Sequence, residues 1–290
     1  MSLLLKPSTD LAGRIAHAYP SLSDGHRKAA DFVLQHPLDS ATMTIEGLAE
    51  QSGTSTATVT RFVRSLGYAN YGEFRAALSE ALKLAMAPVD SLADARAMAG
   101  APVTTLAMAL RDEAANLEET IALLEEPTAA NAIATILKAR RIFLLASGAS
   151  HHVASLLEDG LTLYLDADVI FANARGGAER AIRHIMSVGP GDLVLAISMP
   201  RYSHTTVELS KFAKSRGATV LTLTDAPTSP LVPVADLTLF APARNRLLPN
   251  SPTAVFALAD ALITAVACER PDAVEALKDL SESLLWTFHL

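Results

Sequence analysis

Residues 44–68 read TIEGLAEQSGTSTATVTRFVRSLGY, a pattern that predicts two short helices joined by a tight turn. Thr44 and Ser55 stand immediately before the two helices, where a hydroxyl caps a helix N-terminus. Gly53 falls in the turn, where glycine takes a positive φ without steric cost. Because a helix-turn-helix of this layout places its second helix in the major groove of DNA, the stretch favours DNA binding.

The two faces of these helices differ in chemistry. Apolar residues recur at helical spacing and predict the buried side: Ile45, Leu48, Ala49, Val59, Phe62 and Val63. Five polar residues are expected to lie at the DNA surface: Ser55, Thr56, Thr58, Arg61 and Arg64. A helical hairpin without function is the alternative, but no acid occurs between Gln51 and Asn70, which favours DNA binding.

The net charge of −7 is unevenly spread. Residues 1–85 carry eight Lys/Arg and eight Asp/Glu, so the remaining 16 basic and 23 acidic residues account for all of it. Because non-specific attraction to DNA would be weak, the chain must rely on local arginines and on binding as a dimer. We expect a homo-oligomer, a dimer or a dimer of dimers, that reads double-stranded operator DNA.

Composition also indicates the setting of the chain. No run is apolar enough to span a bilayer, and the start of the sequence lacks the apolar stretch of a signal peptide. The single cysteine, Cys268, lies in an apolar helical run and is expected to be a small buried residue. Since it has no partner for an internal disulfide, the sequence fits a reducing cytoplasm.

Periodicity divides the chain into an all-helical region (residues 1–84), an alanine-rich, partly helical linker (85–102) and a mixed region (103–290). Further helices are expected at residues 11–18, 23–35, 74–84, 103–124, 128–137, 253–268 and 271–289. Five short apolar runs alternate with helices from residue 141: RIFLLA, DVIFA, LVLAIS, TVLTLT and LTLFA. The pattern predicts an α plus α/β chain whose second part is a doubly wound parallel sheet of about five strands.

Ligands of open α/β sheets bind beyond the carboxyl ends of the strands. The first strand is followed by Ser147 and Ser150, and the third by Ser198, Ser203, Thr205 and Thr206. Hydroxyls and backbone N–H groups at a helix N-terminus favour an anion such as a phosphate, and Arg201 adds a charged fork. Plain capping explains either turn alone, whereas two such turns on neighbouring strands favour a phosphate site, with His204 at its mouth.

Other chemistries fit the sequence less well. No Gly-x-Gly-x-x-Gly follows a strand, so a dinucleotide site is disfavoured and no cofactor is expected. His151 and His152 are adjacent, diverge on a helix and do not share a metal. No nucleophile, base and orienting group can be assembled from spacing, so we expect no catalytic residues and no enzyme activity.

With both regions considered, the chain resembles the RpiR (MurR/RpiR) family of bacterial transcriptional regulators over nearly its whole length. The helix-turn-helix resemblance rests on residues 55–62, STATVTRF, and on the trailing Leu66-Gly67-Tyr68. The C-terminal region resembles a SIS (sugar isomerase) domain, a fold that binds phosphorylated sugars. The resemblance implies a regulator whose operator affinity responds to a phosphorylated sugar or related small acid.

The SIS motifs are only partly present. Of Gly-x-Gly-x-Ser after the first strand, Gly148 and Ser150 match, while Ala146 replaces the first glycine. Of Ser-x-Ser-Gly-x-Thr, Ser198 matches the start, the loop is two residues longer, and His204 replaces glycine. The altered loop predicts a different phosphate or a non-phosphorylated acid.

Two alternative functions stay open. One is a sugar-phosphate isomerase with a helical N-terminal appendage, and the other is a sugar-phosphate sensor that has lost DNA contact. For a regulator, we expect the 85–102 linker and its adjoining helices to transmit ligand binding by changing the separation of two recognition helices.

Overall fold

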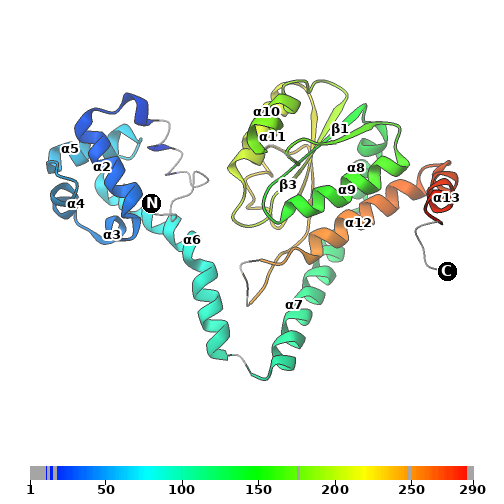
Figure 1. The fold of residues 1–290 in the computed structure, drawn as a ribbon, viewed down its shortest axis with the longest axis horizontal. Helices are drawn as coiled ribbons and strands as arrows, with labels where there is room; N and C mark the ends of the chain where they lie inside the picture. Colours follow the sequence, from blue (N-terminus) through cyan, green and yellow to red (C-terminus); the bar gives the residue numbers. More distant parts are fainter. Residues whose placement is uncertain are drawn as a thin grey trace. The chain divides into compact units, whose positions relative to one another are not determined.

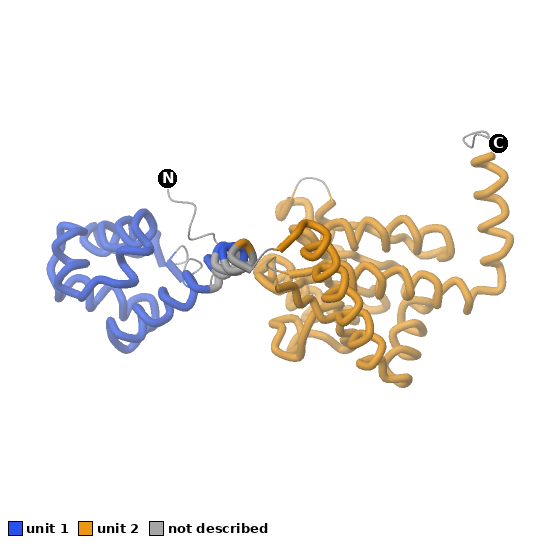
Figure 2. Tube along the Cα trace, turned by 90° about the horizontal axis from the view of Figure 1, so that it is seen from below, with its two compact units in different colours: residues 1–94 blue, residues 95–290 orange. Residues whose placement is uncertain are grey.

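The computed structural model describes residues 11, 14–15, 18–98, 100–174, 177–246, 248 and 250–285. The chain forms two compact units, Met1–Asp94 and Ala95–Leu290 (Figure 2). Most elements of both units are labelled in Figure 1. No helix among these described residues is long and apolar enough to cross a membrane.

The described part of the first unit is all-helical, as predicted. Its elements are η1 (Tyr19–Ser21), α2 (Asp24–Gln35), α3 (Pro37–Thr42), α4 (Ile45–Gln51), α5 (Thr56–Ser65) and α6 (Tyr71–Met98). The helix expected at residues 11–18 lies partly outside the described residues. Proline lacks the N–H that a helix interior requires but fits its first turn, so Pro37 follows the end of α2 and begins α3.

Helix α6 is longer than the sequence predicts. It was expected at residues 74–84, but it continues to Met98, through Pro88 and most of the alanine-rich segment. Alanine has the highest helix propensity, which offsets the backbone hydrogen bond lost at a proline. Helix α7 (Pro102–Ala122) begins after this segment with its own proline in the first turn.

The first unit buries the apolar side that the helix-turn-helix pattern predicts. Leu48, Ala49, Val59, Phe62 and Val63 are buried, whereas Ile45 is only partly buried. Helices α2, α4 and α5 therefore share one core, to which α6 adds Phe74, Leu78 and Leu82.

The second unit contains a five-stranded parallel sheet, which confirms the predicted fold class. Its strands are β1 (Arg141–Ala146), β2 (Asp168–Phe171), β3 (Asp192–Ile197), β4 (Thr219–Thr224) and β5 (Leu237–Phe240). They lie in the order β2-β1-β3-β4-β5, and every neighbouring pair is parallel.

Helices cover both faces of the sheet (Figure 1). They are α8 (Glu126–Lys138), α9 (Ser150–Tyr164), α10 (Gly177–Ile185), α11 (His204–Ser215) and α12 (Thr253–Cys268). Helix α7 packs on α12, and α13 (Ala273–Leu284) projects from the end of the unit without a buried residue (Figure 2). Ile142 and Leu144 of β1 pack in the core that α8, α9 and α12 cover. Phe143 and Leu145 point the other way, into the core under α10 and α11. The sheet is thus doubly wound.

Cys268 is exposed, contrary to the expectation that it is buried. The buried side of α12 includes Leu262, Ile263 and Val266. Because successive helix residues are about 100° apart, Cys268 lies about 200° from Val266 and faces outward.

The strand order also places the carboxyl ends of β1 and β3 at a topological switch point. From β1 the chain runs through α9 to β2 at one side, and from β3 it runs through α11 to β4 at the other. Connections that leave two adjacent strands in opposite directions leave a crevice between them, where ligands of such sheets bind. The two hydroxyl-rich turns singled out in the sequence follow β1 and β3 at this switch point.

Candidate DNA-reading helix and ligand site

The caps predicted for the helix-turn-helix are confirmed. Thr44 Oγ1 accepts a hydrogen bond from the Gly47 N–H at 3.2 Å, which caps α4. Ser55 Oγ accepts one from the Thr58 N–H, also at 3.2 Å, which caps α5. Gly53 has a φ of +62°, so the turn uses the conformation that glycine adopts without strain.

Four of the five predicted DNA contacts lie on the exposed side of α5. Ser55, Thr56, Arg61 and Arg64 are exposed. Thr58 is half-buried; its hydroxyl bonds that of Ser55 at 2.9 Å, and its methyl group packs against Gly25 of α2. The cap of α5 thus holds Thr58 close to the protein, and contact of all five residues with DNA stays a prediction.

Aromatic residues fix α5 against α6. Phe62 of α5 meets Phe74 edge to face, with ring centroids 6.1 Å apart. The Tyr71 hydroxyl donates to the carbonyl of Met43 at 3.1 Å, just before α4.

The start of α6 carries a signal that sequence reasoning missed: Asn70 and Glu73 have capping-box spacing. Asn70 Oδ1 accepts the Glu73 N–H at 2.9 Å, and Glu73 accepts the Ala69 N–H at 3.0 Å.

The first turn of the ligand site follows β1. Gly148 takes a φ of +62°, and α9 begins at Ser150, which is buried, while Ser147 is half-buried. Asn173, just beyond β2, accepts the Ala146 N–H at 3.2 Å and donates to the Ala146 carbonyl and to Ser147 Oγ. Asn173 therefore positions Ser147, and its signal in the sequence was its place at the end of a predicted strand.

The second turn follows β3 and is held by its own hydroxyls. Ser198 Oγ accepts the Ser203 N–H at 3.0 Å, and Ser203 Oγ accepts the Thr206 N–H at 3.2 Å. Beneath them, Thr224 of β4 donates to the Ser198 carbonyl at 2.8 Å. Ser198 and Ser203 accept these bonds through oxygen lone pairs and thereby hold the loop in shape, so their O–H groups can still donate to an anion.

Between these serines the loop takes an unusual backbone conformation. Arg201 has a φ of +68°, a left-handed conformation that costs an L-residue about 1–2 kcal/mol. Asn250 Nδ2 donates to the Pro200 carbonyl at 3.1 Å, and the Tyr202 hydroxyl donates to Asp225 at 2.8 Å. Burial, and then the bond to Asp225, raise the pKa of Tyr202, so this phenol keeps its proton. Sequence reasoning missed Asn250 and Asp225, which are distant in the chain.

The fold brings the eight predicted ligand residues to the carboxyl ends of two adjacent strands. Ser150, Ser198 and Thr206 are buried. Half-buried are Ser147, Ser203 and Thr205, while Arg201 and His204 are exposed. Their contact with a ligand stays a prediction. Among the residues that the structure describes, no cluster of His, Cys, Asp and Glu is arranged to hold a metal ion.

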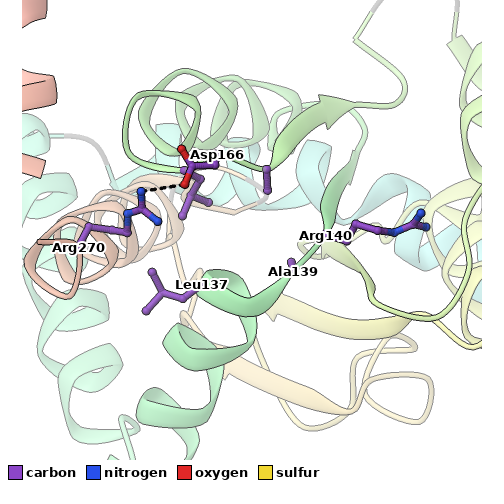
Figure 3. A pocket seen from close by; sticks show the side chains of 7 residues that line it. Leu137, Ala139, Arg140, Asp166 and Arg270 are labelled. Carbon is purple, nitrogen blue, oxygen red and sulfur yellow. Dashed lines mark hydrogen bonds and ion pairs between the residues drawn. The ribbon is translucent and has the colours of Figure 1, made fainter. Parts of the chain in front are cut away.

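A hollow of about 240 Å³ lies at the opposite end of the sheet, before β1 and β2 (Figure 3). Both of its cations are already paired: Arg270 with Asp166 at 3.0 Å and with Asp272 at 2.7 Å, and Arg140 with Asp192 at 3.0 Å. Because these carboxylates neutralise the arginines, the hollow is a poor anion site and does not compete with the turns at the switch point.

Comparison with known proteins agrees with both halves of this description. Residues 9–84 match the helix-turn-helix domain of the rpiR family, and residues 135–265 match the SIS domain. The HTH-type transcriptional regulator HexR of Pseudomonas aeruginosa is 30% identical over 239 residues, which cover 80% of this chain and 79% of that protein. The chain belongs to the rpiR family of transcriptional regulators.

Two solved structures share the fold of this rpiR-family regulator. The sugar isomerase domain of an RpiR transcription factor from Sphaerobacter thermophilus is 27% identical with a TM-score of 0.55, covering 63% of this chain and 98% of that one. The NanR protein of Vibrio vulnificus, complexed with ManNAc-6P, is 22% identical with a TM-score of 0.58, covering 97% of this chain and all of that one.

Proposed function

We propose that this regulator binds operator DNA through α5 and that a phosphorylated sugar or related small acid, bound between the β1 and β3 turns, controls its operator affinity. The observation that carries the ligand site is the meeting of two hydroxyl-rich turns at the switch point of the sheet. Because its partner is chromosomal DNA, the regulator acts in the bacterial cytoplasm.

The chemistry of the turns favours an anionic ligand. Ser203 and Thr206 stand at the N-terminus of α11, where the helix dipole and backbone N–H groups attract negative charge. Arg201 brings a guanidinium to the same loop, and His204 begins the helix. The likeness to NanR complexed with ManNAc-6P supports phosphorylated sugars as the first compounds to test.

For the DNA contact, α5 offers complementary groups on one exposed side. Arg61 and Arg64 are one helical turn apart, so both reach the same groove or the adjoining phosphates. Ser55 and Thr56 lie at the N-terminal end of α5, the end of a recognition helix that meets base edges. Selection of a binding sequence from random double-stranded DNA tests this assignment, and failure to enrich any sequence contradicts it.

A regulator needs no catalytic group, and we propose that the chain is not an enzyme. Its curated relatives are transcriptional regulators, which supports this. The rival is a sugar-phosphate isomerase with an added helical unit. Turnover of hexose or pentose phosphates by the purified chain would establish the rival, while ligand binding without sequence-selective DNA binding would favour a sensor that has lost DNA contact.

We propose further that the regulator is a homodimer or a dimer of dimers. Helix α13 has no buried residue and exposes Val274, Leu277, Leu280 and Leu284. Exposed apolar rows of this kind favour contact with another chain, and a symmetric pair matches a palindromic operator. Light scattering at micromolar concentration is expected to give a dimer or a tetramer, and a stable monomer contradicts the proposal.

A thermal-shift panel of sugar phosphates tests the ligand site directly. A ligand at about a hundred times its dissociation constant adds about 2.7 kcal/mol of stability. Ser150→Ala and Ser203→Ala are expected to weaken binding of the hit. Ser187→Ala, which removes an exposed hydroxyl before β3 at the opposite end of the sheet, is the matched control and keeps wild-type affinity. Equal binding by all variants would show that the ligand lies elsewhere.

A further inference from the structure

Helix α7 packs on the sheet unit with polar residues inward. Its buried residues are Asp112, Asn116 and Thr120, whereas Val103 and Leu110 are 71% and 68% exposed. A surface helix of a globular domain ordinarily buries its apolar side. Hydrogen bonds and charges therefore contribute much of the attachment of α7, and such bonds can be exchanged for bonds to water or to other partners.

The polar side of α7 binds the connection between β5 and α12, residues 241–252, through Arg244, Arg246 and Ser251. Asp112 accepts from the Arg246 guanidinium, with Nε at 2.8 Å. Asn116 pairs with the backbone of Arg244, donating to its carbonyl at 2.7 Å and accepting its N–H at 3.2 Å. Buried side chains thus tie one helix to one connecting segment over about two turns.

The same connection reaches the proposed ligand site. Asn250 donates to the Pro200 carbonyl at 3.1 Å, in the peptide that precedes the left-handed Arg201. The next residue, Ser251, is 1% exposed and donates to Glu113 of α7. Two consecutive residues, Asn250 and Ser251, therefore join the β3 turn to α7.

We propose that Asn250 is a positioning residue that transmits ligand binding at the β3 turn to α7. This inference rests on the proposed function, because it requires a ligand between the β1 and β3 turns. An anion that draws the Arg201 guanidinium reorients the Pro200–Arg201 peptide and so changes its bond to Asn250. Ser251 then shifts against Glu113, and the polar contacts of α7 change with it.

The covalent path from α7 leads toward the DNA-binding unit. Helix α6 ends at Met98 and α7 begins at Pro102, and α6 contributes Phe74 and Leu78 to the core that contains α5. A ligand controls DNA binding only if it favours one of two states, so a helix held by exchangeable bonds suits this role. Within the sheet unit, Asn250 and α7 are therefore the elements through which ligand binding would reach α6.

Amide hydrogen exchange on the full chain tests the inference, with N-acetylmannosamine 6-phosphate (ManNAc-6P) and inorganic phosphate as probes. In the wild type, a bound probe is expected to change amide exchange both in residues 198–206 and in α7. In Asn250→Ala the response of residues 198–206 is expected to persist while that of α7 is lost. Asn131→Ala, which removes an exposed amide from α8, serves as the matched control and keeps both responses.

Glu113→Gln provides a second, nearly isosteric way to weaken the link at Ser251, and it is expected to reduce the α7 response. An unchanged α7 response in Asn250→Ala and Glu113→Gln would overturn the inference. So would a wild type whose 198–206 segment responds while α7 does not. If neither probe alters residues 198–206 in the wild type, the ligand site itself is misassigned, and the inference falls with the proposed function.

Discussion

Helices α5 and α11 begin with the same turn in different surroundings. Ser55 accepts the N–H three residues on at 3.2 Å, and Ser203 does the same at the same distance. Outside α5 lie exposed arginines, including Arg61. The turn before α11 begins with Ser198, whose carbonyl accepts a hydrogen bond from Thr224 of β4. The β1 turn lies beside it, because β1 and β3 are adjacent strands.

The two caps are alike, so a capped turn by itself does not identify the partner that we propose for each helix N-terminus. Both turns offer a hydroxyl and a positive helix end. The exposed side chains near the α5 cap belong to the same helix, so the proposed partner of α5 can be inferred from contiguous sequence. In α11 the neighbours come from β1, β2 and the β5–α12 connection, and only the strand order brings them together.

The largest effect is expected on stability. It tests whether the two units that carry these turns fold independently of each other. Asp192, at the start of β3, is fully buried and binds Arg140, Arg141 and the Gly189 N–H. Asp192→Asn should cost the sheet unit about 3 kcal/mol, the lower end for breaking a buried ion pair, since both arginines keep contact with water. Calorimetry should show the transition of the helical unit unchanged. Destabilisation of both units together would contradict separate folding.

The pH dependence of this pair has a definite sign. Burial alone would raise the pKa of Asp192, but the hydrogen bonds from Arg141 and Gly189 and the charges of both arginines outweigh it and lower the pKa. The stabilisation is therefore present above the unfolded pKa of about 3.9 and is lost as pH falls below that value. The difference in stability between wild type and Asp192→Asn should shrink below about pH 4. Asp166→Asn, an exposed control, should show little difference.

The second prediction concerns the arginines that distinguish α5. Arg61→Ala should cost about 1–3 kcal/mol of operator affinity and relax specificity at one position if Arg61 contacts a guanine. If it contacts only phosphate, weakening should be uniform across sequences with a smaller salt dependence. Gel-shift titrations at several salt concentrations separate these cases. Arg183→Ala, which removes the same charge from α10, should bind like wild type. Unchanged affinity in Arg61→Ala would mean that another surface reads DNA.

Sequence reasoning did well where the signal was local or periodic. β1 and β4 were predicted to the residue, as was α12, because apolar runs and helical spacing reflect burial directly. It failed at α6, where Pro88 indicated a break but the alanine-rich surroundings kept the helix. It also placed Cys268 inside, because an apolar helix does not show which side faces the sheet.

The candidate ligand site was predictable in outline only. The serines and threonines after β1 and β3 were found because strands end in recognisable turns. Asn173, Asp225 and Asn250 were missed, since each acts through a contact made across at least 23 residues of chain. Such contacts follow from strand order and loop shape, which spacing along one sequence does not encode.

The third prediction tests the comparison most directly, because it makes the same change in both turns. Ser55→Ala and Ser203→Ala should each cost about 1 kcal/mol of stability from the lost cap. Only Ser203→Ala should weaken binding of the sugar phosphate found by thermal shift, and only Ser55→Ala should weaken operator binding in the absence of ligand. Ser203→Thr, which keeps a hydroxyl, should restore ligand binding. Equal effects of both alanine variants on both partners would remove the distinction between the turns.

The smallest effect is expected from backbone strain, which is present in the turn before α11 and absent from the turn before α5. Gly53 gives the helix-turn-helix its left-handed residue without strain, whereas in the β3 loop Arg201 occupies that conformation. Arg201→Gly should therefore stabilise the sheet unit by about 0.5–1 kcal/mol, the relief of strain less the greater entropy of glycine in the unfolded chain. It should also weaken binding of an anionic ligand, since the guanidinium is lost. Arg216→Gly, at a right-handed φ of −87°, is the control and should gain no stability. Denaturant titration measures the first effect and calorimetric ligand titration the second. A gain in stability with ligand affinity unchanged would show that the strained arginine does not serve the ligand; a loss of stability would show that its side chain packs against the loop more than its backbone is strained.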